Sequence, residues 1–240
     1  MLYTLLQISD SLFPSGAFAY SCGLEGLVAA NWGDARVGWL SEGGGGRNGA
    51  DALEPVLGSI FACHLLHCDG LFGVRAHRAM QDDAIDALCE ADQALFAMKT
   101  PRELREASTT IGRSFLTEVA AVLPEDKLLG AWYERVESGA SPGNYAVAFH
   151  AAAAAAGATE HDALLAWGYQ SVAQMTGALL RLGRLGHRGA QSILARLRPV
   201  VERGVQDLLT HDPDSPSSFA PVLEIASMRH ERQYSRLFRS

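Results

Sequence analysis

The sequence predicts an all-α protein, a single-domain antiparallel helical bundle of about eight to ten helices over residues 1–240. Three observations lead to this prediction. Ala and Leu are abundant while β-branched residues are sparse, and no stretch alternates apolar and polar side chains as a strand would. Apolar residues instead recur at spacings of three and four, which is typical of helices that bury one face.

Two helices are marked most clearly by their first residues. Thr100 and Glu103 form a capping box, with a proline at the first helical position, ahead of an apolar stripe that continues to Val122. Thr159 caps a second helix, whose narrow apolar seam extends to Leu182 and is expected to lie in the bundle core. Further helices are expected at 23–31, 51–79, 83–98, 125–137, 144–156 and 188–209.

The connections between these helices are short, with two exceptions. A run of four glycines predicts a flexible loop near 41–50, because glycine loses the most conformational entropy when it becomes ordered. A second loop, at 210–221, precedes the C-terminal tail, residues 222–240.

The opening segment, residues 9–25, mixes turn-forming residues with aromatic ones. Pro14 and Gly16 predict a turn into a helix that begins near Phe18 or Tyr20. The serine in "PSGAF" lacks the flanking glycines of a nucleophile elbow, so a hydrolase site is not indicated. The sequence leaves open whether the two aromatic side chains face the core or a partner.

Composition excludes several classes of protein. The net charge of −7 argues against a nucleic-acid-binding protein, which needs a basic surface to displace counterions from phosphates. The N-terminus has no basic region, and no run of about 18 apolar residues occurs, so we expect neither export nor membrane insertion and place the protein in the cytoplasm. The four cysteines are expected to be reduced thiols: Cys22, Cys63, Cys68 and Cys89.

No pattern of residues predicts an enzyme or a cofactor site. The glycine run lacks the Lys and Ser or Thr of a phosphate-binding loop, and no strand is expected before it. Glu90, Asp92, Glu103 and Glu106 are expected on solvated or salt-bridged helix faces rather than as an acid/base pair, because arginines accompany them. Asp92, which stands between apolar positions, has a second interpretation, in which it faces a neighbouring helix.

The stretch "CHLLHC" carries the one local pattern of metal ligands. Cys63 and His67, and likewise His64 and Cys68, are four residues apart and share a helix face, and thiolate and imidazole suit zinc, nickel or copper. The two pairs lie about 100° apart around a helix, so one ion reaches three of the side chains but hardly four. Packing in the core is the favoured interpretation, and a metal-binding enzyme or metal carrier is the alternative function.

The end of the tail, "RHERQYSRLFRS", combines four arginines with aromatic and apolar residues. Arg and aromatic side chains anchor many protein interfaces. The tail is therefore predicted either to be a docking peptide that becomes ordered on binding or to be a solvated basic end.

The two ends of the chain together resemble one family. "DSLFPSGAFAYSCGLEGLV" and "IASMRHERQYSRLFRS" resemble the opening and the ending of the urease accessory protein UreF family, and "ELREAS" and "LRLGRLGHRGAQSILARL" resemble segments between them. The chain departs from the family's Pro-Leu-Gly-Gln type turn, because Arg184 to His187 stand there instead.

This resemblance implies an all-helical, dimerising protein with no substrate, cofactor or bound metal of its own. UreF-like proteins bind the accessory protein UreD, also called UreH, and the GTPase UreG, in a complex that passes nickel to the urease apoprotein. The tail contributes to the UreD contact, and UreG docks on the dimer. That an Arg of this chain reaches the phosphates of the GTPase and stimulates hydrolysis is a further hypothesis.

The resemblance also names the residues expected to contact partners. In the opening segment they are Pro14, Gly16, Phe18, Tyr20, Ser21, Gly23 and Glu25, and in the tail they are Tyr234, Arg236, Leu237, Phe238, Arg239 and Ser240.

Overall fold

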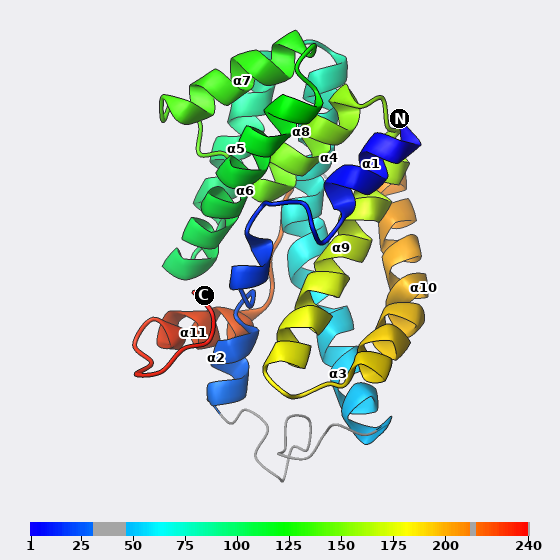
Figure 1. Ribbon diagram of the computed structural model, residues 1–240, viewed down its shortest axis with the longest axis vertical. Helices are drawn as coiled ribbons and strands as arrows, with labels where there is room; N and C mark the ends of the chain where they lie inside the picture. The colour runs from blue at the N-terminus through cyan, green and yellow to red at the C-terminus, as the bar shows by residue number, and fades with distance from the viewer. Residues whose placement is uncertain (31–46, 212–214, 240) are drawn as a thin grey trace.

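The computed structural model describes residues 1–30, 47–211 and 215–239. These residues form helices and connecting turns without a strand, which confirms the predicted all-α fold (Figure 1). In chain order the elements are α1 (Leu2–Ser9), the 3-10 turn η1 (Ala17–Ala19), α2 (Leu24–Ala29), α3 (Arg47–Ile60), the π-helical segment η2 (Phe61–Gly70), α4 (Leu71–Gln81), α5 (Ile85–Met98), α6 (Arg102–Val122), α7 (Lys127–Glu137), α8 (Tyr145–Ala155), α9 (Glu160–Arg181), α10 (His187–His211) and α11 (Pro221–His230).

The helices expected from residue 23 onward are present, with two additions. The predicted helix start near Phe18 or Tyr20 is wrong, because Ala17–Ala19 form only the 3-10 turn η1 and α2 begins at Leu24. The stretch expected as one helix at 51–79 is the continuous run of α3, η2 and α4. The additions are α1, which buries only Leu5 and Ile8, and α11, which occupies the first half of the tail. Within the predicted loop near 41–50, residues 41–46 lie outside the described residues, and α3 has begun by Arg47.

The start of α6 differs from the predicted capping box. The helix begins at Arg102 after Pro101, and no side chain caps it. Glu103 does not turn back towards Thr100, because its carboxylate binds the C-terminal end of the chain instead. The cap of α9 is confirmed, since the Thr159 hydroxyl accepts from the Asp162 N–H at 3.1 Å.

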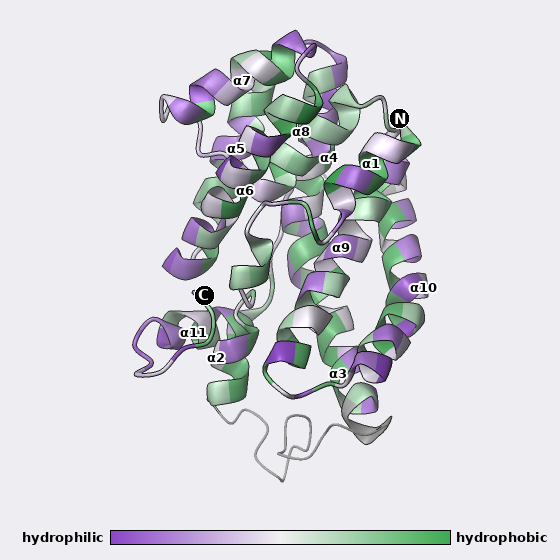
Figure 2. Ribbon diagram, viewed as in Figure 1, coloured by the Kyte–Doolittle hydropathy of each residue, from purple (hydrophilic) through white to green (hydrophobic). Residues whose placement is uncertain are grey.

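The alanine-rich helix α8 lies at the centre of the bundle. Ala146 to Ala153 are all buried, and small side chains let α4 and α6 approach closely. At Gly73 of α4 a Cβ would lie 2.3 Å from the ring of His150, and at Gly112 of α6 it would lie within 2.1 Å of a backbone carbonyl. Figure 2 shows α8 as mostly hydrophobic, whereas α7 and α10 carry many hydrophilic residues.

Asp92 of α5 fixes the start of α8. Its side chain is fully buried and accepts from the Ser141 hydroxyl at 2.6 Å, from the Gly143 N–H at 2.7 Å and from the backbone and side chain of Asn144, each at 2.8 Å. The expectation of a solvated face is therefore wrong for Asp92. The second interpretation, that it faces a neighbouring helix, is confirmed at the N-cap of α8, Asn144, while its other partners lie in the segment just before that helix.

Within residues 1–30, 47–211 and 215–239, one helical stretch, Ala50–Gln81, is long and apolar enough to be a candidate membrane span, although it contains no uninterrupted run of about 18 apolar residues. Of its most apolar window, 67% is buried inside the protein. This stretch contacts α8, α9 and α10, so packing in the bundle accounts for its apolar character.

Candidate partner-binding site

The two ends of the chain lie side by side. Figure 1 shows η1 and α2, drawn in blue, next to α11 and the residues after it, drawn in red. The backbone N–H of Arg239 donates to the carbonyl oxygen of Ala19 at 3.0 Å, and α2 packs along α11. The opening segment and the tail therefore form one continuous structure.

Glycine lines the contact between α2 and α11. A Cβ at Gly26 would lie 2.4 Å from the carbonyl oxygen of Ala226, and a Cβ at Gly23 would lie 2.9 Å from the side chain of Leu223. Gly23 also has a φ of 80°, a left-handed conformation that favours glycine, immediately before α2. Larger residues at these two positions would push the helices apart.

Glu25 on α2 holds the end of the chain in place. Its residue surface is 7% exposed, and its carboxylate accepts from the backbone N–H of Leu237 at 2.6 Å and from that of Phe238 at 2.9 Å. Nε2 of His230 lies 2.9 Å from the same carboxylate. One side chain of the opening segment thus binds both α11 and the backbone that follows it.

His230, which is fully buried, joins two carboxylates from different helices. Its Nδ1 lies 2.8 Å from Oε2 of Glu103 on α6, while its Nε2 faces Glu25. Each ring nitrogen therefore lies within hydrogen-bond distance of a carboxylate from a different helix. Arg236 adds a cation, with Nη1 2.9 Å from Oε1 of Glu103. We call these four side chains, Glu25, Glu103, His230 and Arg236, the polar clamp.

Sequence reasoning missed Glu103 and His230 as members of this site. Of the two alternatives expected for Glu103, a solvated or a salt-bridged face, the salt-bridged one is confirmed by its pair with Arg236, although the residue is buried at 7% exposure. Both residues stand in segments that resemble the family, "ELREAS" and the ending. Nothing in their spacing, however, connects two residues that are 127 positions apart.

The expected contact residues divide into outward and inward sets. Phe18 is 72% exposed, and Tyr234 and Leu237 are also exposed, whereas Tyr20 and Phe238 are buried. Of the two aromatic residues of the opening segment, Phe18 therefore faces outward and Tyr20 faces the core. Of the remaining residues, Pro14, Arg236 and Arg239 are exposed, Gly16 is half-buried, Ser21, Gly23 and Glu25 are buried, and Ser240 lies outside the described residues.

The inward aromatic residues attach the two ends to the bundle. Tyr20 packs with Ala107 and Ile111 of α6. The guanidinium of Arg181, from α9, lies 4.5 Å from the centre of the Phe238 ring, a distance typical of a cation–π contact. Arg181 also donates to the carbonyl oxygen of Phe18.

A polar groove of about 340 Å³ lies between the two ends of the chain and α6. Three arginines line it: Arg102, Arg236 and Arg239. Arg102 is paired with Glu231, and Arg236 belongs to the polar clamp. Within the part of the chain that the structure describes, no ion pair involves the guanidinium of Arg239, so this cation is available to an acidic group.

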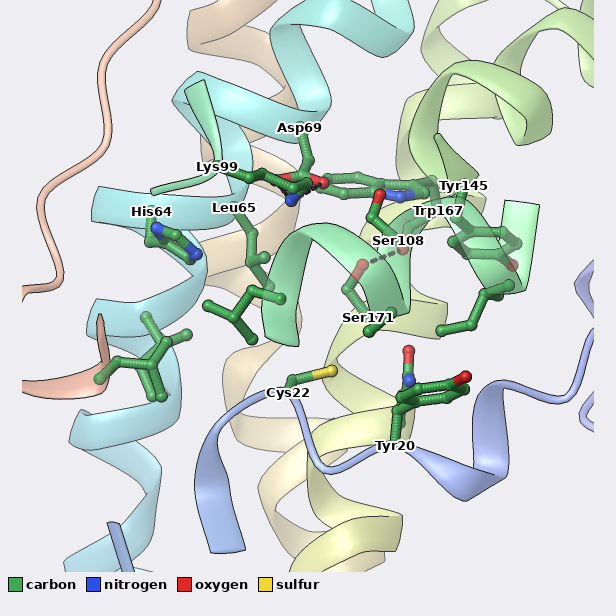
Figure 3. A pocket seen from close by; sticks show the side chains of 16 residues that line it. Tyr20, Cys22, His64, Leu65, Asp69, Lys99, Ser108, Tyr145, Trp167 and Ser171 are labelled. Atoms are coloured by element: carbon green, nitrogen blue, oxygen red, sulfur yellow. Dashed lines mark hydrogen bonds and ion pairs between the residues drawn. The ribbon is translucent and has the colours of Figure 1, made fainter. Parts of the chain in front are cut away.

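A second, inner cavity of about 90 Å³ lies beneath the opening segment (Figure 3). Lys99 and Asp69 form a buried ion pair at one end, with Nζ 2.7 Å from Oδ1. Burial lowers the pKa of the Lys99 ammonium, but Asp69, together with Cys68 and Cys22, outweighs this effect and the net direction is upward. Cys22 lies across the cavity, and burial raises the pKa of its thiol to about 11.

The "CHLLHC" stretch forms η2, and its side chains do not gather around one point. Cys63 is exposed, whereas Cys68 is buried, and Nδ1 of His64 lies 2.7 Å from the hydroxyl of Ser218. Burial, together with the nearby lysine, lowers the pKa of His64 to about 4. Among the described residues, no three His, Cys, Asp or Glu side chains are placed to hold a metal ion together.

The wider turns of η2 bind the segment that leads to α11. The backbone N–H of Ser217 donates to the carbonyl oxygen of His67, and that of Phe219 donates to the carbonyl oxygen of Cys63. The segment expected as a loop at 210–221 is therefore, where described, held against the bundle. This placement explains why α11 reaches α2.

The fold and the site thus define an all-helical protein whose two ends are joined by a buried polar network. A family model for UreF matches residues 48–198. A urease accessory protein UreF from Nostoc sp. is 30% identical over 236 residues, which cover 98% of this chain and 94% of that relative. One from Yersinia enterocolitica is 28% identical over 240 residues, covering 99% and 97%.

The chain therefore belongs to the UreF family of urease accessory proteins. The family model covers Glu103 but neither of the two chain ends that supply the rest of the polar clamp, whereas both relatives align over nearly the whole chain. His187, which departs from the expected turn, is exposed at the first residue of α10.

Proposed function

We propose that this chain is a non-enzymatic scaffold that assembles the machinery for inserting nickel into urease. As a single domain over residues 1–240, it acts in the cytoplasm as a homodimer. It binds UreD, also called UreH, together with UreG and the urease apoprotein. Nickel is the cargo of this assembly rather than a cofactor of the chain. Membership of the UreF family and the arrangement of the two chain ends support the proposal.

The main support for the proposal is that buried and exposed large side chains alternate at the two chain ends. Tyr20 and Phe238 are buried, while Phe18, Tyr234 and Leu237 stay exposed beside them. Their buried neighbours fix the backbone at these positions. The large exposed side chains therefore lose little conformational entropy when a partner binds them. Aromatic residues of this kind commonly supply most of the binding energy at an interface.

The polar groove supplies the second half of the proposed surface. Arg236 and Arg239 flank the outward residues, and the guanidinium fork is suited to carboxylates of a partner. Together these residues form a surface with an apolar centre and a charged rim, as is usual in the interfaces of specific protein complexes. We assign this surface to UreD, and we leave the remainder of the bundle to the dimer contact and to UreG.

Reconstitution tests the accessory function. Urease apoprotein, UreD, UreG, nickel and GTP are incubated with and without the chain, and urea hydrolysis is then measured. We expect activation only when the chain is present. Equal activation in its absence would contradict the proposal, and so would hydrolysis of urea by the chain alone.

A further inference from the structure

The inner cavity has the lining of a small-molecule site. It opens to solvent at one side, and most of its wall is apolar, with Ile60, Leu104, Ile111 and Trp167 among the contributing side chains. Figure 3 shows Lys99, Asp69 and Ser108 at one end of this space and Cys22 at the other. Sites for small molecules commonly combine an apolar wall with a few polar groups that fix the orientation of the ligand.

Lys99 has a donor to offer at the polar end. Its Nζ lies 2.7 Å from Oδ1 and 2.8 Å from Oδ2 of Asp69. An ammonium group has three protons, and the two carboxylate oxygens take up at most two of them. In the described part of the chain no other side chain pairs with this ammonium group, so at least one N–H is left for a ligand.

Ser108 has a hydroxyl that the helix does not use. Serines inside helices commonly donate to the carbonyl oxygen four residues earlier, as Ser9, Ser59 and Ser171 do here at 2.6, 2.8 and 2.9 Å. The Ser108 hydroxyl makes no such bond, and within the described residues it is buried without a partner although it lines the cavity. Because a buried hydroxyl without a partner is unfavourable, a molecule in the cavity that bonds to it gains affinity.

The charges around the cavity favour a neutral ligand. Among the described residues that line it, Lys99 and Asp69 are the only charged side chains, and they neutralise each other. Burial lowers the pKa of His64 to about 4 and raises that of Cys22 to about 11, so both are uncharged near pH 7. An ion entering this space would lose hydration without meeting a net opposite charge.

The size of the cavity limits the ligand to a few atoms. A dry protein cavity of about 150 Å³ accommodates benzene, so the volume of about 90 Å³ found here takes about four non-hydrogen atoms. Any further atom extends towards the open side. Water against the apolar wall finds few hydrogen-bond partners, and its displacement by a hydrocarbon group is favourable.

We propose that the inner cavity binds a small neutral carbonyl compound of the short-chain carboxamide class. Its carbonyl oxygen accepts from Nζ of Lys99, its amide N–H donates to the hydroxyl of Ser108, and its hydrocarbon part lies against the apolar wall. This site goes beyond the proposed function and does not rest on it.

An NMR titration of the full chain with propionamide tests the proposal. The indole N–H of Trp167 reports on the cavity, whereas that of Trp132, which donates to Ser141 at 3.2 Å, lies outside it and is the internal control. We expect a saturable shift of the Trp167 resonance, with a dissociation constant on the order of millimolar for so small a ligand, and no shift of Trp132. Propionate has the same shape but carries a charge, and it should bind at least about tenfold more weakly.

Two substitutions at one position locate the ligand. Ser108→Ala removes the unpaired hydroxyl, and we expect propionamide to bind about fivefold more weakly. Ser108→Leu places a larger side chain in the cavity and should abolish the Trp167 shift. Ser114→Ala is the matched control, since this serine is on the same helix, is half-buried and does not line the cavity.

Three results would overturn the proposal. A Trp167 resonance that shows no saturable shift means that the cavity holds water only. Equal affinity for propionate and propionamide contradicts the preference for a neutral ligand. Unchanged binding in a folded Ser108→Leu variant places the ligand elsewhere. The comparison of the two ligands on the wild-type chain decides the first two points even if a variant does not fold.

Discussion

Nδ1 of His230 lies 2.8 Å from Oε2 of Glu103, and this contact joins the end of the chain to the first turn of α6. The other ring nitrogen faces Glu25, so one buried imidazole bridges two buried carboxylates from different helices. The outward positions of the tail depend on this arrangement, because the residues after α11 follow directly from His230.

Removal of the imidazole should release the tail. His230→Ala leaves the buried carboxyl groups of Glu25 and Glu103 without the ring that bonds both, which is a costly state that the chain relieves by letting α11 detach. We expect trypsin to cleave after Arg232 and Arg236 about tenfold faster than in the wild type, while the helices of the bundle stay intact. His161→Ala, at an exposed histidine on α9, is the control, and equal cleavage of both variants would contradict the role of the clamp.

The contact between α2 and α11 should tolerate no side chain larger than hydrogen at Gly26. A Cβ there would lie 2.4 Å from the Ala226 carbonyl oxygen, so Gly26→Ala should cost about 2 kcal/mol of the free energy that holds α11 in place. Hydrogen exchange of the α11 amides measures this loss. Gly130→Ala on α7 meets no atom within 4 Å and should leave the exchange unchanged. Normal protection of α11 in the Gly26 variant would show that the helices are not closely packed.

Asp92 should contribute more to stability than any surface aspartate. Asp92→Ala leaves the Ser141 hydroxyl and the N–H groups of Gly143 and Asn144 without an acceptor, and we expect the free energy of unfolding in urea to fall by about 3 kcal/mol. Asp86→Ala, on the same helix but exposed, should change it little. Similar losses in the two variants would argue against the buried network.

Buried histidines should make the protein less stable in acid. Burial lowers the pKa of His150 to about 4, a shift that His77 assists and that the Ala146 carbonyl and Asp69 oppose. The unfolded chain therefore binds a proton first as the pH falls from 6.5, and the free energy of unfolding decreases between pH 6.5 and 4. At pH 5 the free energy of unfolding should be lower by about 2 kcal/mol than at pH 7 because of this one histidine.

The measurement is urea unfolding at pH 7 and pH 5 for the wild type and for His150→Gln, which cannot titrate. We expect the variant to lose less stability on acidification than the wild type, although His64 still contributes because its pKa is lowered in the same way. His161→Gln, at an exposed site, should behave as the wild type does. An unchanged pH dependence in the His150 variant would contradict the assignment.

Local patterns predicted the helices well where one face of a long helix is buried. The apolar stripe that leads to Val122 and the seam that leads to Leu182 both lie in the core, and Thr159 caps its helix as expected. The two missed helices are short, and α11 carries apolar residues on both its buried and its exposed sides, as Leu223 and Ile225 show. Periodicity carries little information for such elements.

The site was predicted only in part, because its contacts join distant parts of the chain. The resemblance named Glu25 and Phe238, but it treated both as partner contacts, and the structure places them in contacts within the chain. Whether they also contribute to binding a partner stays a prediction. Glu103 and Asp92 look like surface acids in a sequence window, since only the folded chain brings their donors near.

The most direct test of the proposed function is the affinity for UreD of a double variant, Tyr234→Ala with Leu237→Ala. Both side chains are exposed and take no part in the polar clamp, so the variant should keep its fold, whereas deletion of the tail would also remove the buried Phe238. Tyr169→Ala, at an exposed tyrosine on α9, is the control. The account predicts that the double variant binds UreD about a hundredfold more weakly and that the control binds normally. Unchanged affinity in a correctly folded double variant would contradict it.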